Sequence, residues 1–275
     1  MATIPKKVKD RLSKNITKFQ KILSTAKDRD INESDTVNIV TDMLDEVFGY
    51  DKYVEVTSEF AIRGTYCDLA IKLDNKIQFL IEVKAVGIDL KGNHLRQSID
   101  YAANQGISWV ILTNGISWQI HKVRFEKPIN NDLVASLDFT SVNPRSDKDH
   151  ECLYLIAKEG VQKNARDDFY EKVQNINKYV IGNFLLSEPI LSTLRRELRK
   201  FAEGLKIDSS ELQEIIKNEV IKREIFDTED GKKAESKVNR FLRKSTRTKS
   251  KAKENSSAND EAKSTEVPQA FKTPV

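Results

Sequence analysis

Three charged side chains, Asp68, Glu82 and Lys84, lie within short apolar segments of the sequence. A charged group in a half-buried strand carries a desolvation cost, and Asp is depleted from strands. We therefore expect these residues to serve chemistry rather than packing. Two carboxylates beside an ammonium group suit a hard cation and a phosphodiester substrate, which indicates metal-assisted hydrolysis.

The alternation of apolar residues predicts how the three groups meet. Residues 66–73 and 77–84 alternate as two strands of a hairpin. A two-residue loop would place the apolar row of one strand on the polar side of the other. A three-residue loop at 74–76 gathers eight apolar side chains on one face and sets Asp68 opposite Glu82, with Cβ atoms roughly 5 Å apart. These eight are Cys67, Leu69, Ile71, Leu73, Ile77, Phe79, Ile81 and Val83.

Opposed carboxylates destabilise a hairpin unless a cation lies between them. The register therefore predicts a metal site at Asp68 and Glu82, and oxygen ligands favour Mg²⁺, with Mn²⁺ as an alternative. Lys84 projects from the same face, where it could hold a water molecule beside the metal.

These residues carry a resemblance to a known family. Asp68, the spacing to Glu82-Val83-Lys84 and the following Gln97-Ser98-Ile99-Asp100-Tyr101 resemble the PD-(D/E)XK nuclease core with the Gln-x-x-x-Tyr motif of its RecB-like branch. More closely, residues 30–125 resemble the N-terminal nuclease domain of type I restriction enzyme R subunits (HsdR N-terminal domain family). One departure is Cys67, where the family name has proline.

The resemblance implies roles for five residues. Asp68 and Glu82 would bind Mg²⁺, Lys84 would orient the attacking water, and Gln97 and Tyr101 would contact DNA or support the active site. The alternative for the last two is an ordinary boundary row of the helix, with Tyr101 half buried.

Glu33 is a candidate extra carboxylate, since this fold often places one on its first core helix. The competing interpretation is that an acid at a helix start only complements the helix dipole. His94 is left out of the catalytic set, because a lone histidine is more often structural.

The R subunit of this family continues into an ATP-driven translocase, for which the chain has no room. Gly87 and Gly92 have the spacing of a phosphate loop, but Asn93 follows where lysine is needed, so we expect no ATP site. The partners implied are DNA and a separate motor or specificity subunit, and a homodimer would bring two single-strand cutters together.

The elements that must position these residues follow from periodicity. It predicts helices and strands in the order αβββαββ, which is the restriction-endonuclease-like α/β core implied by the resemblance, with a mixed sheet flanked by helices. Periodicity alone would predict only a mixed α/β fold. The predicted elements are helices 6–27, 33–48 and 93–105, strands 53–62, 66–73, 77–84, 109–113 and 116–121, and later helices 148–158, 165–186, 189–205 and 209–226.

The predicted domain organisation has four parts. An N-terminal helix occupies residues 1–30, a nuclease-like domain 31–145, a helical region 146–228 and a disordered basic tail 229–275. Residues 232–275 hold 12 Lys or Arg against 5 Asp or Glu, while the whole chain has a formal charge of +4. Such a tail could contact phosphates, or only keep the protein soluble.

Composition narrows the class of protein. At 275 residues and 39% hydrophobic, the chain can bury one α/β core and a smaller helical unit. It shows neither a membrane-spanning apolar stretch nor a signal peptide, and its two cysteines are too few for a disulfide framework. We expect a cytoplasmic protein without membrane contact.

Two functions remain open from the sequence. The first is a Mg²⁺-dependent DNA endonuclease of restriction or defence. The alternative is a non-catalytic nucleic-acid-binding or regulatory protein that retains the nuclease fold.

Overall fold

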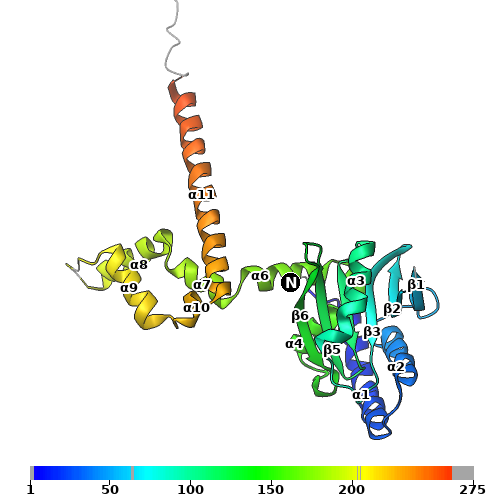
Figure 1. Ribbon diagram of the computed structural model, residues 1–275. Coiled ribbons are helices and arrows are strands. Elements are labelled where there is room, and N and C mark those ends of the chain that lie inside the picture. The colour runs from blue at the N-terminus through cyan, green and yellow to red at the C-terminus, as the bar shows by residue number, and fades with distance from the viewer. Residues whose placement is uncertain (1–2, 63–64, 203, 205, 262–275) are drawn as a thin grey trace, which may run out of the picture. The chain divides into compact units, whose positions relative to one another are not determined.

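The computed structural model describes residues 3–62, 65–202, 204 and 206–261 (Figure 1). The chain forms two compact units, unit 1 at residues 1–173 and unit 2 at residues 174–275. The finer division predicted from the sequence, at residues 30, 145 and 228, stays a prediction.

Unit 1 is a mixed α/β fold built on a six-stranded sheet, which confirms the predicted fold class (Figure 1). Its strands are β1 (Val56–Ile62), β2 (Thr65–Leu73), β3 (Lys76–Val83), β4 (Trp109–Thr113), β5 (Ser117–Arg124) and β6 (Asn130–Asp138). Its helices are α1 (Lys6–Asp28), α2 (Glu33–Glu46), the 3₁₀ turn η1 (Gly92–Leu95), α3 (Arg96–Gln105), the 3₁₀ turn η2 (Phe139–Ser141), α4 (Asp147–Tyr154), α5 (Lys158–Gln162) and the start of α6 (Ala165–Asn175).

The strands lie in the sheet in chain order, β1-β2-β3-β4-β5-β6. Strands β3 and β4 are parallel, because η1 and α3 cross over between them, and the other neighbours are antiparallel. All five residues of β4 are buried, as expected for a strand covered on both faces. Strand β6 was missed by the sequence analysis, since it is an edge strand of mainly polar residues with Leu133 57% exposed.

The β2–β3 hairpin corrects the predicted loop. Its turn has two residues, Asp74 and Asn75, with φ of +49° and +64°, so Leu73 pairs with Lys76. Opposite the step from Ile71 to Lys72, a bulge then inserts one residue, Gln78, into β3. Beyond the bulge the pairs include Ile71↔Phe79 and Leu69↔Ile81, which is the register predicted for the site.

Helices cover both faces of the sheet. On one face α1, α2, α4 and α5 enclose the larger core, which contains six of the eight predicted hairpin side chains. On the other face α3 encloses a smaller cluster. The remaining two hairpin side chains, Cys67 and Ile77, belong to this smaller cluster. The bulge explains the position of Ile77, because the residues of β3 between the bulge and the turn change to the other face of the sheet.

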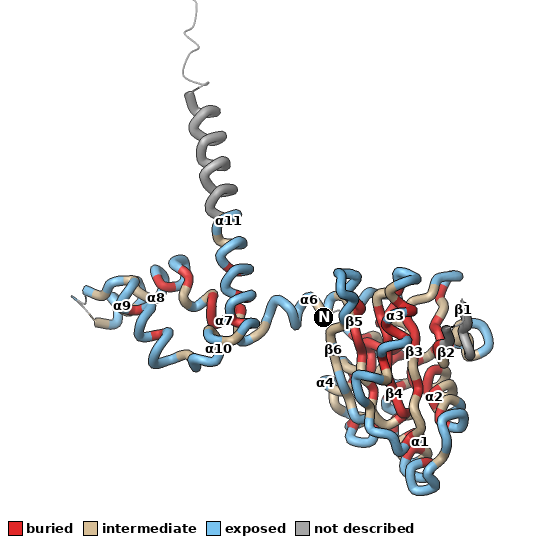
Figure 2. The backbone as a smooth tube through the Cα atoms, in the orientation of Figure 1, coloured by how far each residue is buried: buried red, intermediate tan, exposed pale blue. Residues whose placement is uncertain are grey.

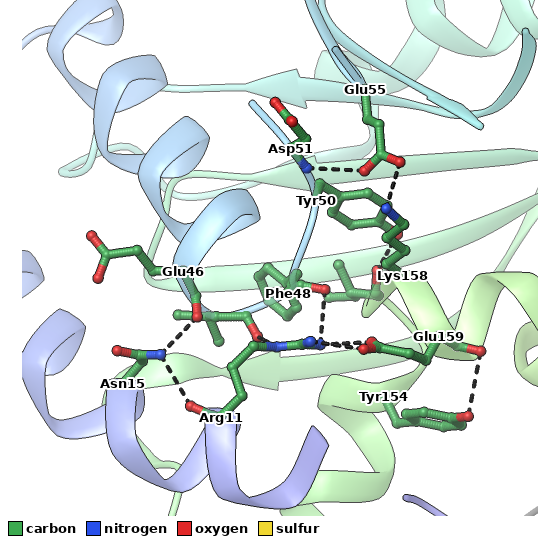
Figure 3. A network of polar contacts seen from close by, with 12 residues as sticks. Arg11, Asn15, Glu46, Phe48, Tyr50, Asp51, Glu55, Tyr154, Lys158 and Glu159 are labelled. Carbon is green, nitrogen blue, oxygen red and sulfur yellow. Dashed lines mark hydrogen bonds and ion pairs between the residues drawn. The ribbon is translucent and has the colours of Figure 1, made fainter. Parts of the chain in front are cut away.

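A polar network ties α1 to the segments around it in unit 1 (Figure 3). The Arg11 guanidinium donates to both carboxylate oxygens of Glu159, at 2.8 and 2.7 Å, and to the carbonyls of Val47 and Phe48. Gly49 has φ of +83°, and a Cβ there would lie 2.5 Å from Arg11 Cζ. Helix α1 is therefore anchored within unit 1.

Unit 2 is helical. It contains α7 (Lys178–Leu185), α8 (Glu188–Phe201), α9 (Ser209–Ile215), the π-helical turn η3 (Ile216–Val220), α10 (Glu224–Asp227) and α11 (Glu229–Glu261). The predicted tail begins at residue 229, and its described part is helix α11. The rest of that tail, 262–275, lies outside the described residues. No helix within the described ranges is long and apolar enough to cross a membrane.

Candidate active site

Asp68 lies on β2, directly before Leu69, which pairs with Ile81 of β3. Its Oδ2 accepts a hydrogen bond of 2.7 Å from the backbone N–H of Val83, which places the carboxylate against β3 beside Glu82. Burial raises the pKa of Asp68 to about 6, and the charge of Glu82 acts in the same direction. The Val83 hydrogen bond and the charge of Lys84 oppose this rise without cancelling it.

Glu82 is held at both carboxylate oxygens. Oε1 accepts from Lys84 Nζ at 2.8 Å, and Oε2 accepts from Ser98 Oγ at 2.5 Å. The Glu82 side chain is only 13% exposed, so these two donors fix a carboxylate that has lost most of its water. Ser98 is fully buried on α3.

Ser98 was not identified from the sequence. It occupies the apolar stripe of α3, between Leu95 and Ala102, where a small hydroxyl residue reads as packing. Its position three residues after Leu95 could have indicated its role, because this spacing places Ser98 on the helix face that packs against the sheet.

Lys84 follows the last residue of β3, and its backbone N–H donates to Thr113 of β4 at 2.8 Å. Its ammonium donates to Glu82 and, at 2.9 Å, to the carbonyl of Val83. Burial acts to lower the pKa of Lys84, but the hydrogen bond to Glu82 and the nearby carboxylates outweigh it, so the pKa is raised. Lys84 is therefore an ammonium ion at neutral pH.

Glu33 reaches the same cluster from the first residue of α2. Both of its carboxylate oxygens lie 3.5 Å from Lys84 Nζ, and its side chain is 49% exposed. Helix α2 begins here because Asn32 caps it by accepting from the Asp35 N–H at 2.9 Å. Glu33 thus has a contact with the predicted site in addition to its favourable place at a helix start.

The two motif residues of α3 differ in how far they are buried. Gln97 is exposed on the surface of the helix. Tyr101 is 4% exposed and packs in the smaller core with Cys67, so it is more deeply buried than the boundary position predicted for it.

The structure thus brings together Asp68, Glu82, Lys84 and Glu33 from three elements of unit 1. The family comparison concerns the same segment. Residues 39–134 match the family described as "Type I restriction enzyme R protein N terminus (HSDR_N)". No curated protein and no solved structure matches the chain.

The segment matched to the R-protein N terminus includes Asp68, Glu82 and Lys84 and all of α3, and it leaves Glu33 and α1 outside. It runs from within α2 into β6, so it holds the catalytic candidates together with the strands that position them. The match supports a type I restriction enzyme R-protein-like region at 39–134.

The donor set of this R-protein-like region is small. Within the described residues, no group of three or more His, Cys, Asp and Glu side chains is arranged to hold a metal ion. Asp68 and Glu82 are two adjacent carboxylates that could hold a cation, and Mg²⁺ commonly takes one or two carboxylates and keeps waters for a phosphate. The raised pKa of Asp68 fits a cation site, because a positive charge would relieve the cost of two carboxylates in a half-buried place.

Proposed function

We propose that this protein is a metal-dependent DNA endonuclease with a PD-(D/E)XK active site, acting in restriction or defence in the cytoplasm. The observation that carries the proposal is the cluster itself. Asp68 lies on one strand, Glu82 on the next, and Lys84 is hydrogen-bonded to Glu82. The family match at residues 39–134 supports the same class of enzyme.

The carboxylates of Asp68 and Glu82 would hold the cation, Mg²⁺ or Mn²⁺. When bound, such an ion supplies a Lewis acid for a phosphoryl oxygen and lowers the pKa of a bound water. Val83 and Ser98 orient the two carboxylates by donating one hydrogen bond to each. This fixed geometry avoids reorganisation when substrate arrives.

Lys84 would act through its ammonium group as a hydrogen-bond donor. Two of its three N–H groups donate to Glu82 and to the Val83 carbonyl. Within the described part of the chain, the third has the 3.5 Å contacts with the half-exposed Glu33, so it can turn to a water molecule or a phosphate oxygen. Lys84 would therefore position the nucleophile and neutralise charge on the phosphate.

Incubation of the purified full chain with supercoiled plasmid DNA tests this proposal. We expect nicking or linearisation with Mg²⁺ or Mn²⁺, without ATP, and none with EDTA. The variants Asp68→Ala and Lys84→Ala should lose at least about 100-fold in rate, since each removes a group that acts in the transition state. Lys76→Ala is the matched control, because Lys76 is an exposed lysine of the same strand.

Two outcomes would contradict the proposal. One is equal cleavage by wild type, Lys84→Ala and Lys76→Ala, which would indicate a contaminating nuclease. The other is inert wild type over duplex DNA, single-stranded DNA and RNA with either metal, which would favour the non-catalytic nucleic-acid-binding alternative.

A further inference from the structure

Helix α11 of unit 2 carries positive charge along the side that its own packing leaves exposed. Its buried positions recur at helical spacing, at Gly231, Ala234 and Val238, and Leu242 continues them as a partly buried residue (Figure 2). The side chains of Ala234, Val238 and Leu242 pack with Val180, Tyr179 and Phe184 of α7. The opposite side of the helix therefore faces water.

That side is lined by cations and small polar groups. Two hollows along it are lined by Lys232, Lys233, Ser236, Lys237 and Arg240, and by Ser236, Asn239, Arg240, Arg243 and Lys244. Every one of these residues is exposed. We call this set the α11 cationic face.

The ion pairs of α8 differ from those of Lys232, Lys233 and Arg240 on this face. On α8, Arg196 and Lys200 pair with Glu197 at 3.1 and 2.9 Å. Among the residues that the structure describes, the ion pairs include none with Lys232, Lys233 or Arg240. In the sequence, residues 229–253 hold ten Lys or Arg and three Asp or Glu. A merely solvated charged helix usually interleaves the two signs, which this face does not.

We infer that the α11 cationic face binds the phosphate backbone of duplex DNA, independently of the catalytic cluster in unit 1. The inference rests on the proposed function, since a DNA endonuclease needs contacts with phosphates outside its active site. Residues 232–244 extend over about 18 Å of helix, which matches about five base pairs. Lysine, arginine, serine and asparagine side chains are the groups that contact phosphates without reading sequence.

A membrane surface fits this face less well. A helix that lies on a membrane needs an exposed apolar face to insert. The apolar stripe of α11 is instead turned onto α7, and the hollows expose only polar and charged residues. Charge complementarity therefore favours a nucleic-acid backbone.

Binding of the full chain to a labelled 30-base-pair duplex tests the inference, in EDTA and over a series of salt concentrations. For three to six phosphate contacts, the slope of log K against log salt should be about −3 to −5. The triple variant Lys232→Gln, Lys233→Gln, Arg240→Gln should flatten the slope by about 2 to 3 and weaken binding about 10- to 100-fold at 0.1 M salt.

The matched control removes three cations from α8 of the same unit, as Arg196→Gln, Arg199→Gln, Lys200→Gln. We expect its affinity to stay within about twofold of wild type, because two of these cations are already paired with Glu197. Thermal melting of both variants establishes that they fold.

Three results would overturn the inference. They are a wild-type slope flatter than about −1, equal weakening by the α8 and α11 variants, or binding to phosphatidylserine vesicles without binding to DNA. The test is separable from the proposed function. The Lys76→Ala protein should bind as wild type does, and a chain inert toward plasmid but showing the predicted slope would refute the nuclease alone.

Discussion

The substitution Asp68→Asn should stabilise the metal-free protein, because it removes a carboxylate that the fold holds at a cost. Burial raises the pKa of Asp68 from 3.8 to about 6. Between these values the folded state binds the proton more tightly than the unfolded state. The stability of the wild type therefore falls as pH rises through this window and levels off above about pH 6.

The magnitude follows from the size of the shift. A rise of about two pKa units corresponds to about 3 kcal/mol, and solvent screening of this half-buried group reduces it to about 2 kcal/mol. Asparagine keeps an oxygen that can accept from the Val83 N–H, so the hydrogen bond at 2.7 Å survives the substitution. For a unit of this size, about 2 kcal/mol is about 4 to 8 °C in Tm.

Thermal melting in EDTA at pH values from 3.5 to 8 measures the effect. The gap between Asp68→Asn and wild type should be near zero at pH 3.5 and reach its full size by pH 7. Asp100→Asn, which changes an exposed carboxylate on α3, should show no such gap. A lower Tm for Asp68→Asn at pH 7.5, or a gap that does not vary with pH, would refute the reasoning.

Three further predictions concern groups around the site and in the core. Ser98→Ala should lower the rate of metal-dependent cleavage about 10-fold and raise the Mg²⁺ concentration needed for half-maximal rate, while Tm falls by only a few degrees, because one hydrogen bond to the active-site glutamate is lost. Gly49→Ala should lower the free energy of unfolding, measured by chemical denaturation, by at least about 2 kcal/mol, because φ is positive there and a Cβ would meet Arg11. Gly106→Ala, with φ of +69° and nothing within 4 Å of the added Cβ, should lower it by only about 1 kcal/mol. Burial acts to raise the pKa of Glu159, but the hydrogen bonds from Arg11 outweigh it and leave the pKa lowered. Arg11→Gln should therefore lower the free energy of unfolding by about 2 kcal/mol at pH 7. The loss should shrink as the pH falls below about 4.5, and urea titration at several pH values measures it.

The hairpin shows how far the sequence predicted the site. Apolar alternation fixed the register beside Asp68 and Glu82, because a shift of one residue would have exposed the core row. The predicted three-residue loop was wrong, because a two-residue turn and a one-residue bulge at Gln78 of β3 take its place. A bulge leaves no period-2 signal of its own, so alternation could not distinguish the two solutions.

Other parts of the site depend on tertiary packing that periodicity does not contain. Ser98 looked like a small residue of an apolar stripe, yet its hydroxyl donates to Glu82. Tyr101 was predicted either to face substrate or to lie half buried at the boundary of the helix, and the structure packs it in the smaller core. Glu33 could be explained by the helix dipole alone until its contact with Lys84 was known. In each case the partner comes from a different element of the fold.

Direct measurement of metal binding tests the central claim, which is that Asp68 and Glu82 together hold a divalent cation. Isothermal titration of the full chain with Mn²⁺ at pH 7.5 should show one site in the wild type. Asp68→Asn and Glu82→Gln should each weaken binding at least about 10-fold, and Asp100→Asn should leave it unchanged. Binding of equal strength in wild type and both site variants would contradict the claim.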